Sequence, residues 1–432
     1  MLKYFFQFVL KLMARAVLSR HRPRVVGITG SMGKTTTKQA VAAVLQTRFS
    51  VRASSGNFNN EIGLPLSVLG VSSGLSGFSL GASVFLNFFR SFFTSQYPEM
   101  LVLEMGADKV GDIAYLTRIA PPHIGLVTRV AEAHTQNFGD VETIQKEKAK
   151  IVSALSHSGL AVLNADDARV MAMSQLHKGK IITFGLSEGA DVRAMGAEVT
   201  QRLFGPEFRA EADLGTKFMI RYNGASYRVE VSGLLGLPQV YALLAGFAAG
   251  VSLGIGPKHC AEALIRVAPV PGRLRPISGI KNTIVLDDTY NSSPDAAVEA
   301  LKVLKQVRAR RRLAVLGDML ELGAQTETAH RHLGRIARDL GVDLLFTVGE
   351  RARFIAEEAW LSGFAKSKIF EFETTEDAAI PLQNKLAEAD AVLIKGSQGV
   401  RMEKIVLEIM AHPQDASELL CRQEPKWQKP PK

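Results

Sequence analysis

The chain has 432 residues, which at roughly 150 residues per domain predicts two to three domains, each large enough for its own hydrophobic core. Hydrophobic residues make up 47% of it and charged residues 22%, values that exclude a mainly disordered protein. The 52 basic and 42 acidic residues give a net charge of +10, which favours anionic partners. Nucleic acid is not expected among them, because aromatic residues are not interleaved with the basic clusters. The only cysteines, Cys260 and Cys421, cannot form a disulfide framework, so we expect a cytoplasmic protein.

Residues 1–23 are predicted to form an amphipathic N-terminal helix. Polar residues recur every four positions along this apolar segment: Lys3, Gln7, Lys11 and Arg15. These residues argue against a membrane-spanning helix. A second apolar stretch, between Glu61 and Arg90, is interrupted by proline, glycine and serine, and we predict a helix, a loop and a second helix there.

Both segments carry more aromatic surface than one helix face can bury, so we expect something else to pack over these side chains. In one hypothesis the two helices pack on each other and on the rest of the protein. In the other, residues 1–20 lie on the inner membrane face, where basic side chains meet anionic lipid: Lys3, Lys11, Arg15, Arg20, Arg22 and Arg24. The second hypothesis predicts a cytoplasmic enzyme held peripherally at the membrane.

From Arg24 onward, aliphatic runs alternate with helical patterns, which is typical of a mostly parallel sheet covered by helices. Strands are predicted at residues 25–29, 100–104, 124–128, 161–164, 283–286, 312–316, 344–348 and 391–394. Residues 218–231 read as an antiparallel hairpin that turns at Asn223-Gly224. The pattern breaks at a Pro-rich turn, so we predict two α/β units, residues 24–268 and 269–411, the second of Rossmann-like character. Residues 412–432 are expected to be a disordered tail.

The strand at residues 25–29 runs directly into a glycine-rich loop and then a helix. The loop reads Gly30-Ser31-Met32-Gly33-Lys34-Thr35-Thr36. In such a loop, glycines let backbone N–H groups approach phosphate oxygens, a lysine reaches the β- and γ-phosphates, and a hydroxyl can bind Mg²⁺. We therefore predict a P-loop ATPase domain whose nucleotide site consists of Gly30, Ser31, Gly33, Lys34, Thr35 and Thr36. The loop departs from the strict motif at Ile28, where a glycine is expected.

Further motifs follow in order along the chain. They are Asn57-Phe-Asn-Asn60-Glu-Ile-Gly-Leu-Pro-Leu66, Leu103-Glu-Met-Gly-Ala-Asp108, Asn164-Ala-Asp-Asp167, Pro271-Gly-Arg273, Asp287-Asp-Thr-Tyr-Asn-Ser-Ser-Pro294, Leu316-Gly-Asp-Met-Leu-Glu-Leu-Gly323 and Lys395-Gly-Ser397. With the glycine-rich loop, these motifs resemble the Mur ligase family over residues 24–406. The resemblance implies ATP-dependent amide ligation through an acyl phosphate. The family member most resembled adds D-alanyl-D-alanine to a muramoyl peptide during peptidoglycan precursor synthesis, which implies small-molecule substrates.

The same resemblance implies roles for individual residues at two Mg²⁺ sites. Lys34 would contact the phosphates, and Thr35 with Glu104 would bind the Mg²⁺ of the nucleotide. His134 would bind a second Mg²⁺, and Lys148 would be carbamylated by CO₂ into an anionic metal ligand. From the residues alone, a structural salt bridge is the less favoured alternative for Glu104, whereas a lone histidine such as His134 is more often an ordinary surface or core residue.

Other matches lie on the substrate side. Arg273 would meet the γ-phosphate when the domains close, and Asp288 would contact the nucleotide. Asn291 would face either the nucleotide or the acceptor. The resemblance implies substrate contacts for the remaining matches: Asn57, Asn60, Lys395 and Ser397. Asp318, Glu321 and His330 match as well but suit capping and packing equally.

Two departures leave alternatives open. Where the family has Gly-x-His-Asn-x-x-Asn against adenine, this chain reads Gly236-Leu-Pro238-Gln239-Val-Tyr-Ala242, so the base contact is expected to be rebuilt or weakened. About a hundred residues of an N-terminal domain that binds uridine diphosphate are expected before the loop and about 24 are present, so we expect that domain to be lacking. One alternative is a related ligase with a different, lipid-linked carboxylate donor, and another is a non-catalytic nucleotide-binding module. The joint presence of Lys34, Glu104, His134, Lys148 and Arg273 favours a ligase, and we expect it to be a monomer.

Overall fold

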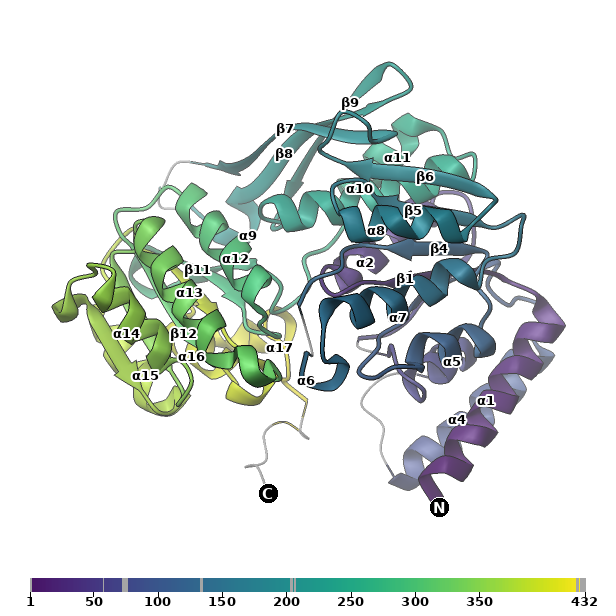
Figure 1. The fold of residues 1–432 in the computed structure, drawn as a ribbon, viewed down its shortest axis with the longest axis horizontal. Helices are drawn as coiled ribbons and strands as arrows, with labels where there is room; N and C mark the ends of the chain where they lie inside the picture. The colour runs from purple at the N-terminus through teal and green to yellow at the C-terminus, as the bar shows by residue number, and fades with distance from the viewer. Residues whose placement is uncertain are drawn as a thin grey trace.

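The computed structural model describes residues 2–56, 58–71, 77–132, 135–202, 205, 207–424 and 427. Figure 1 shows two α/β bodies side by side, each built on one sheet with helices on both faces. The predicted α/β class is confirmed.

The first sheet has nine strands in the order β2-β3-β1-β4-β5-β6-β7-β8-β9. Its bounds are β1 Arg24–Thr29, β2 Val51–Ala53, β3 Met100–Glu104, β4 Ile124–Val127, β5 Leu160–Asn164, β6 Lys180–Gly185, β7 Val192–Gln201, β8 Leu214–Tyr222 and β9 Ala225–Ser232. Neighbouring strands from β2 through β7 in this sheet order, β1 included, pair in parallel, whereas β7, β8 and β9 pair antiparallel. The predicted hairpin is confirmed: Asn223 and Gly224 both have positive φ, as a tight two-residue turn requires.

Helices cover both faces of this sheet. On one face lie α2 Lys34–Leu45, α10 Leu237–Ser252 and α11 Pro257–Leu264, whose apolar side chains form one core with the strands. On the other lie α3 Gly63–Leu69, α5 Asp112–Ile119, α7 Val141–Ser153 and α8 Ala168–Ala172. Because β1 and β3 are buried on both sides, their residues are nearly all apolar.

The second sheet has six strands in the order β10-β11-β15-β12-β13-β14, parallel except for β10. Its bounds are β10 Arg275–Gly279, β11 Thr283–Asp288, β12 Arg312–Gly317, β13 Leu344–Val348, β14 Ile369–Phe372 and β15 Ala391–Lys395. Helices α12 Pro294–Gln306, α13 Thr326–Asp339 and α14 Arg353–Leu361 cover one face, and α15 Thr375–Lys385 and α16 Glu403–Ile409 cover the other. Short α6 Thr135–Phe138 and α9 Ala210–Asp213 lie where the two bodies meet (Figure 1).

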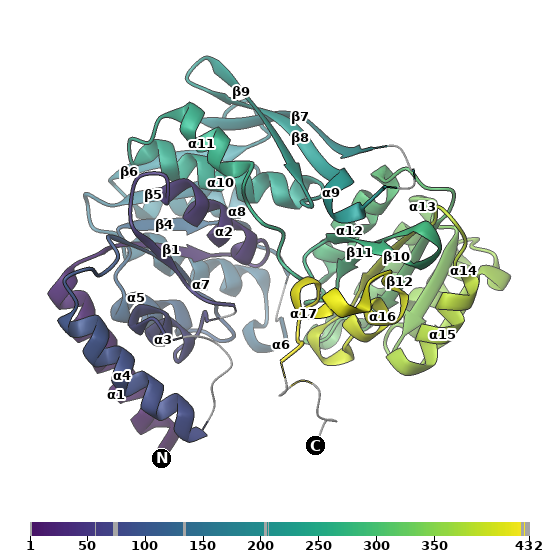
Figure 2. The same ribbon diagram turned by 180° about the vertical axis from the view of Figure 1, so that it is seen from behind.

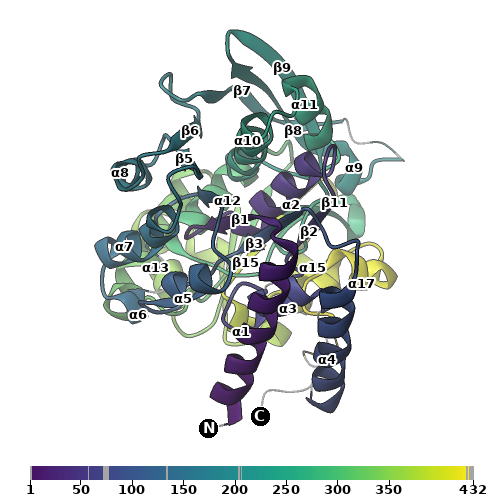
Figure 3. The same ribbon diagram turned by 90° about the vertical axis from the view of Figure 1, so that its right-hand side faces the viewer.

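The N-terminal helix and the aromatic helix pack against each other. Helix α1 Leu2–His21 contacts α3 and α4 Gly77–Phe93, and its Leu10, Ala14 and Val17 are fully buried. Figure 3 shows both helices extending side by side away from the first sheet. The packing hypothesis is therefore confirmed for one face of α1. Within the described residues, no helix combines the length and the apolar character needed to cross a bilayer.

The expectation of a disordered tail is wrong for residues 412–424. A single turn, α17 Ala416–Leu419, follows α16, and Leu419, Leu420, Cys421 and Arg422 are all buried. The leucines join the apolar cluster under the second sheet. Figure 2 shows α17 beside α16, on the side of the second body that faces the first. Local composition did not reveal this segment, because several of its partners, among them Thr289 and Tyr290, lie more than a hundred residues earlier in the chain.

Candidate active site

The glycine-rich loop joins β1 to α2 in the geometry of a phosphate site. Gly33 caps α2 with φ 77°. Gly30 has φ 148°, and a Cβ there would lie 1.9 Å from the Thr128 hydroxyl, so only glycine fits. Hydrogen bonds to the segment after β4 fix the loop, among them Ser31 N to the Arg129 carbonyl at 2.7 Å. The first turn of α2 thus presents its unpaired N–H groups to an anion.

Lys34 lies folded over this loop. Its Nζ donates to the carbonyl of Gly30 at 2.7 Å. Burial lowers the pKa of Lys34, Arg273 lowers it further, and Glu104 opposes both. The charges of Glu104, from the first body, and of Arg273, from the second, therefore both act on this ammonium.

Glu104 ends the buried strand β3 and is the centre of a polar cluster. Its Oε2 accepts from the Thr35 hydroxyl at 3.2 Å and lies 3.9 Å from Lys38 Nζ, and its Oε1 accepts from Asn59 Nδ2 at 3.1 Å. A carboxylate and a hydroxyl in contact are the hard oxygen donors that Mg²⁺ prefers, so the donor set fits this metal. The described residues contain no cluster of three or more His, Cys, Asp and Glu side chains suited to a metal.

Lys148 is buried in α7, one of the helices under the first sheet. Burial, followed by the nearby charge of Lys34, lowers the pKa of Lys148 to about 7. The charges of Glu147 and Asp108 oppose this lowering in part. The Glu147 carboxylate accepts from the backbone N–H groups of Gly111 and Ile113 at 2.9 and 2.7 Å. Lys148 is therefore an amine that is substantially uncharged near neutral pH.

The second body supplies the opposite wall. Arg273 follows the Gly272 turn, and its guanidinium lies 4.1 Å from the centre of the Tyr290 ring. Asp288, at the end of β11, pairs with Lys395, at the end of β15, at 2.7 Å. Both carboxyl ends lie at the edge of the sheet where α/β proteins bind ligands. Lys395 also donates to the Asn291 carbonyl at 2.8 Å, which ties the two loops together.

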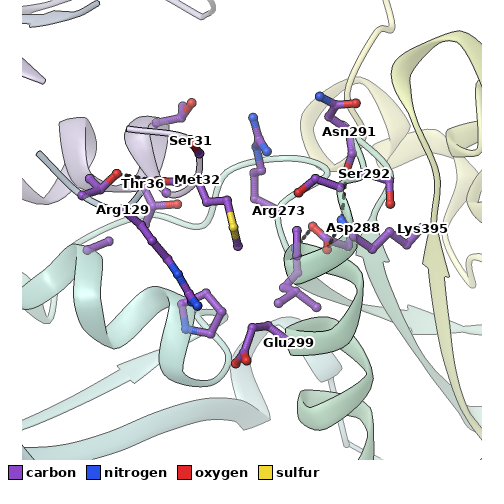
Figure 4. A pocket seen from close by; sticks show the side chains of 18 of the residues that line it. Ser31, Met32, Thr36, Arg129, Arg273, Asp288, Asn291, Ser292, Glu299 and Lys395 are labelled. Atoms are coloured by element: carbon purple, nitrogen blue, oxygen red, sulfur yellow. Dashed lines mark hydrogen bonds and ion pairs between the residues drawn. The ribbon is translucent and has the colours of Figure 1, made fainter. Parts of the chain in front are cut away.

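A cavity of about 510 Å³ lies between these walls. Figure 4 shows Ser31, Met32 and Thr36 on one side of it and Asp288, Asn291, Ser292 and Lys395 on the other, with Arg273 between them. Arg129 and Glu299 lie at the far end of the same space (Figure 4). The cavity is large enough for a nucleotide, and its lining brings Ser31, Gly33, Thr35 and Thr36 into one site with residues of the second body: Arg273, Asp288, Asn291, Lys395 and Ser397. Gly30 and Lys34 belong to the same loop but do not line the cavity.

The segment that replaces the expected adenine motif also lines this cavity. Leu237, Pro238, Gln239 and Tyr241 come from the start of α10, and Phe184 from β6 lies beside them. Gln239 Nε2 donates to the Arg273 carbonyl at 3.1 Å, while its buried Oε1 has no partner. The Tyr241 hydroxyl donates to Asp166 at 2.8 Å. This wall of the cavity therefore combines apolar side chains with one buried amide oxygen that has no partner.

Some predicted residues have structural partners or lie elsewhere. Asn60 is exposed at the start of α3, where its Oδ1 accepts from Ile62 N and Gly63 N, and it does not line the cavity. Ser397 lines the cavity, yet its hydroxyl accepts from Leu320 N at 2.9 Å. Asn57 and His134 lie outside the described residues. The structure gives Asp318 and His330 structural roles, since their side chains bind the backbone of Ala352 and Met319.

Sequence reasoning missed Lys38 and Asn59, which both contact Glu104. Lys38 is 1% exposed and lies one turn after Lys34 on α2, so the spacing of four residues was a usable signal. Asn59 lies within the Asn57 to Leu66 motif. Its contact with Glu104 spans 45 residues and has no local pattern.

Comparisons with known proteins agree with this geometry. The Mur ligase middle domain matches residues 28–250, and the domain described as "Mur ligase, glutamate ligase domain" matches residues 272–398. The UDP-N-acetylmuramoyl-tripeptide--D-alanyl-D-alanine ligase of Bacillus subtilis is 30% identical over 405 residues, which are 94% of this chain and 79% of that protein. The enzyme of the same name from Mycobacterium tuberculosis is 33% identical over 90% of this chain and 73% of its own length.

Solved structures show the same fold. The MurF ligase of Thermotoga maritima, solved with ADP, superposes with a TM-score of 0.76 at 27% identity and covers 93% of this chain and 83% of its own. A pseudomurein peptide ligase from Methanothermus fervidus superposes with a TM-score of 0.63 at 19% identity, covering 89% of this chain and 79% of its own, which shows a shared fold alone.

Proposed function

We propose that this chain, which belongs to the Mur ligase family, uses ATP to join a substrate carboxylate to an incoming amine. The names of its relatives favour a muramoyl tripeptide as donor and D-alanyl-D-alanine as acceptor. The observation that carries the proposal is the cavity between the phosphate loop of one sheet and the charged strand ends of the other. We take residues 24–268 and 269–411 as the two domains and propose that one monomer holds the whole site.

The chemical difficulty is to bring a carboxylate against the γ-phosphate of ATP, because both are anions. The N–H groups at the start of α2 and the Lys34 ammonium hold the phosphates from one side, and the Arg273 guanidinium approaches from the other. Positive groups already in place stabilise the charge that spreads over the phosphoryl oxygens during transfer. Mg²⁺, when bound by Thr35 and Glu104, would neutralise further phosphate charge.

The reaction then proceeds in two steps, phosphoryl transfer to the carboxylate and acyl transfer to the amine. A carboxylate oxygen bonds to the γ-phosphorus and ADP leaves, which produces an acyl phosphate. The acceptor amine attacks the acyl carbon, phosphate leaves, and the nitrogen loses a proton. The ends of β11 and β15 flank the place where the amine would enter, and the Asp288–Lys395 pair holds these two loops in register.

The finer part of the proposal concerns a second Mg²⁺ and Lys148. Carbamylation requires an uncharged amine, and the buried environment of Lys148 provides one at neutral pH. Addition of CO₂ to Nζ releases one proton and leaves an anionic carbamate, which turns a repelling cation into an oxygen ligand. His134 is the proposed second ligand of this metal.

ADP release measured against a panel of donors tests the ligase. The panel contains UDP-linked and lipid-linked muramoyl peptides, each with and without D-alanyl-D-alanine. We expect release that requires both a donor and the dipeptide, with formation of the joined peptide seen by mass spectrometry. Release that ignores every donor and acceptor would contradict the proposal and favour the non-catalytic nucleotide-binding module.

Lys148→Ala tests the carbamate. We expect activity to fall and to recover in part with added short-chain carboxylates, which can occupy the vacated ligand position. ¹³C-labelled bicarbonate should give a carbamate resonance in the wild type that is absent from this variant. An active Lys148→Ala enzyme with no such resonance in the wild type would leave Lys148 an ordinary helix residue.

We also propose that the enzyme works at the inner membrane face, and the structure offers a surface for this contact. Side chains of α1 and α4 expose large apolar groups over 42% to 76% of their area: Tyr4, Phe5, Phe8, Leu12, Phe85, Leu86, Phe89 and Phe93. We call these eight residues the aromatic ridge. They belong to the two helices that extend together from the first body (Figure 3), and an apolar patch of this kind marks an interaction site.

The charge of the residues around the aromatic ridge favours an anionic lipid surface as its partner. Residues 1–24 and 62–98 contain no aspartate or glutamate and seven basic residues: Lys3, Lys11, Arg15, Arg20, Arg22, Arg24 and Arg90. These seven account for most of the net charge of +10. Each basic residue near an anionic membrane contributes about 1 kcal/mol, in addition to the burial of the ring faces.

Co-sedimentation with vesicles of phosphatidylcholine and phosphatidylglycerol tests this surface. We expect binding that weakens with salt and is lost in the triple variant Phe85→Ser, Phe89→Ser, Phe93→Ser. Trp360→Ser with Leu361→Ser removes two equally exposed apolar side chains from the second body and is the matched control, which should bind as the wild type does. Absence of binding at low salt would contradict the proposal, as would lipid-independent self-association through the same residues.

A further inference from the structure

The chain after α16 returns to the active site. Leu419 and Leu420 are buried under the second sheet, and they place Cys421 and Arg422 beside the loop that follows β11. Arg275 Nη1 holds the turn before them by donating to the Glu418 carbonyl at 3.0 Å. The phosphate and metal chemistry described above makes no use of this segment.

Arg422 is the centre of the contact. Its guanidinium pairs with Glu403 at 2.8 Å, and the two side chains are only 4% and 2% exposed. It also donates to the Thr289 carbonyl at 3.1 Å and to the Tyr290 carbonyl. Its φ of 59° is unusual for a side-chain-bearing residue, so the backbone adopts an unfavourable conformation to place this group.

The loop that Arg422 holds is the one that positions Arg273. Tyr290 N donates to the Gly272 carbonyl at 3.1 Å, directly before Arg273. A Cβ on Gly272 would lie 2.9 Å from Tyr290 N and 3.1 Å from Cys421 Sγ, so this turn is packed tightly between the loop and the tail. The guanidinium groups of Arg273 and Arg422 both lie against the Tyr290 ring, at 4.1 and 5.4 Å from its centre.

We infer that Arg422 is a positioning residue which, through Tyr290, holds Arg273 at the phosphate site. The inference deepens the proposed ligase function, on which it rests. Glu403 connects Arg422 to a second loop, because Glu403 is the first residue of α16 and directly follows the loop that carries Lys395 and Ser397. One buried ion pair thereby fixes the loops after β11 and β15, which both line the cavity.

A double-mutant cycle that combines Arg422→Ala with Arg273→Ala tests whether Arg422 acts through Arg273. Arg422→Ala alone should lower kcat about tenfold or more while KM for ATP changes less, since a displaced guanidinium loses contacts made in the transition state. In the Arg273→Ala background the same change should lower kcat no further. Independent, multiplicative effects of the two substitutions would show that Arg422 does not act through Arg273 and would overturn the inference.

A second variant separates positioning from folding. Removing one partner of a buried pair leaves an unpaired charge, whereas Arg422→Met with Glu403→Leu removes both and keeps an apolar fill. We expect this variant to remain folded and to show the same loss of kcat. Lys404→Ala, which removes the exposed ion pair of α16 with Glu376 but leaves Arg422 in place, is the matched control and should keep kcat within about twofold, as expected for a contact outside the reacting site.

Hydrogen exchange gives a readout that does not depend on activity. In the Arg422→Met, Glu403→Leu variant, amides of residues 272–274 and 289–291 should exchange faster, while those of β1 and β3 should not change. Unchanged exchange in both loops would overturn the inference even if the wild type proved to have no ligase activity. Failure of the proposed function would instead appear as a wild type that joins no donor to D-alanyl-D-alanine.

Discussion

Under the proposed function, Lys34 would contact the phosphates of the nucleotide and Glu104 would bind its metal. Lys34→Ala and Glu104→Gln should each lower acyl-phosphate formation about a hundredfold or more, because each removes one electrostatic stabiliser of the transition state. ADP release under saturating substrates measures the effect, and circular dichroism checks the fold. The exposed Lys178→Ala is the control. Wild-type turnover in either site variant would remove that residue from the mechanism.

Protonation of His330 should make the free energy of unfolding depend on pH, because the fold holds the ring in one neutral tautomer. Its Nε2 accepts from Met319 N at 3.0 Å and its Nδ1 lies 2.6 Å from the Thr326 carbonyl, so the ring is neutral with the proton on Nδ1. Burial lowers the pKa of His330 below the ordinary value of 6.5. The unfolded chain therefore binds the additional proton first, and the free energy of unfolding should be full above pH 6.5 and fall as the pH drops below it.

Urea unfolding between pH 7.5 and 5 measures this loss. His330→Gln should flatten the profile, and His332→Gln, an exposed histidine on the same helix, should leave it unchanged. A wild-type profile that His330→Gln does not alter would assign the acid sensitivity to other groups.

At the residue scale, local patterns alone predicted groups whose partners are nearby, whereas groups with distant partners, such as Glu104 and Lys395, were predicted only through the family resemblance. Lys34 and Thr35 were predictable because strand, loop and helix are contiguous. Asn59 and Arg422 were not, because their contacts with Glu104 and with Tyr290 join segments 45 and 132 residues apart. Distance along the chain, rather than residue type, separates the two sets.

At the scale of elements, we expect the two glycines of the phosphate loop, Gly30 and Gly33, to tolerate substitution differently. Gly30→Ala would place a Cβ 1.9 Å from the Thr128 hydroxyl, which must move the loop, whereas at Gly33 no atom lies within 4 Å of such a Cβ. We expect Gly30→Ala to weaken ATP binding more than tenfold. Gly33→Ala should cost about 1–2 kcal/mol of conformational energy, as expected for the left-handed region. Calorimetric titration with Mg·ATP measures the affinity of each variant, and urea unfolding measures the conformational cost of Gly33→Ala. Equal affinities in the two variants would contradict the close contact at Gly30.

Strands were predicted well wherever a run was buried on both faces, as in β1, β3 and β12, because such runs are almost purely apolar. Strand β2 escaped prediction, since it has only three half-buried residues and one of them is Arg52. The tail was predicted as disordered from its proline and lysine content, but its ordering depends on two leucines that reach the core of the second body.

The whole molecule works as two bodies that meet at one cavity. Away from this cavity they are joined where Glu211 accepts from Ser278 N and from the Ser278 hydroxyl at 2.7 and 2.8 Å, and where the Gln201 side chain bonds to the Arg308 backbone. At the cavity they are joined by Gln239 Nε2 to the Arg273 carbonyl and by Gln136 N to the Glu321 carbonyl. Both bonds involve segments that line the cavity or flank it. A ligand that fills the cavity therefore adds contacts to both bodies and should couple their unfolding.

Thermal unfolding with a non-hydrolysable ATP analogue and Mg²⁺ tests this coupling. At a concentration of 100 times Kd, binding stabilises the folded state by about 2.7 kcal/mol, which should raise Tm by several degrees. Arg273→Ala removes the guanidinium that reaches from the second body toward Lys34, so its shift at the same concentration should be smaller. Arg310→Ala, an exposed arginine of the second body, should shift as the wild type does. An equal shift in Arg273→Ala would mean that the nucleotide is held by the first body alone.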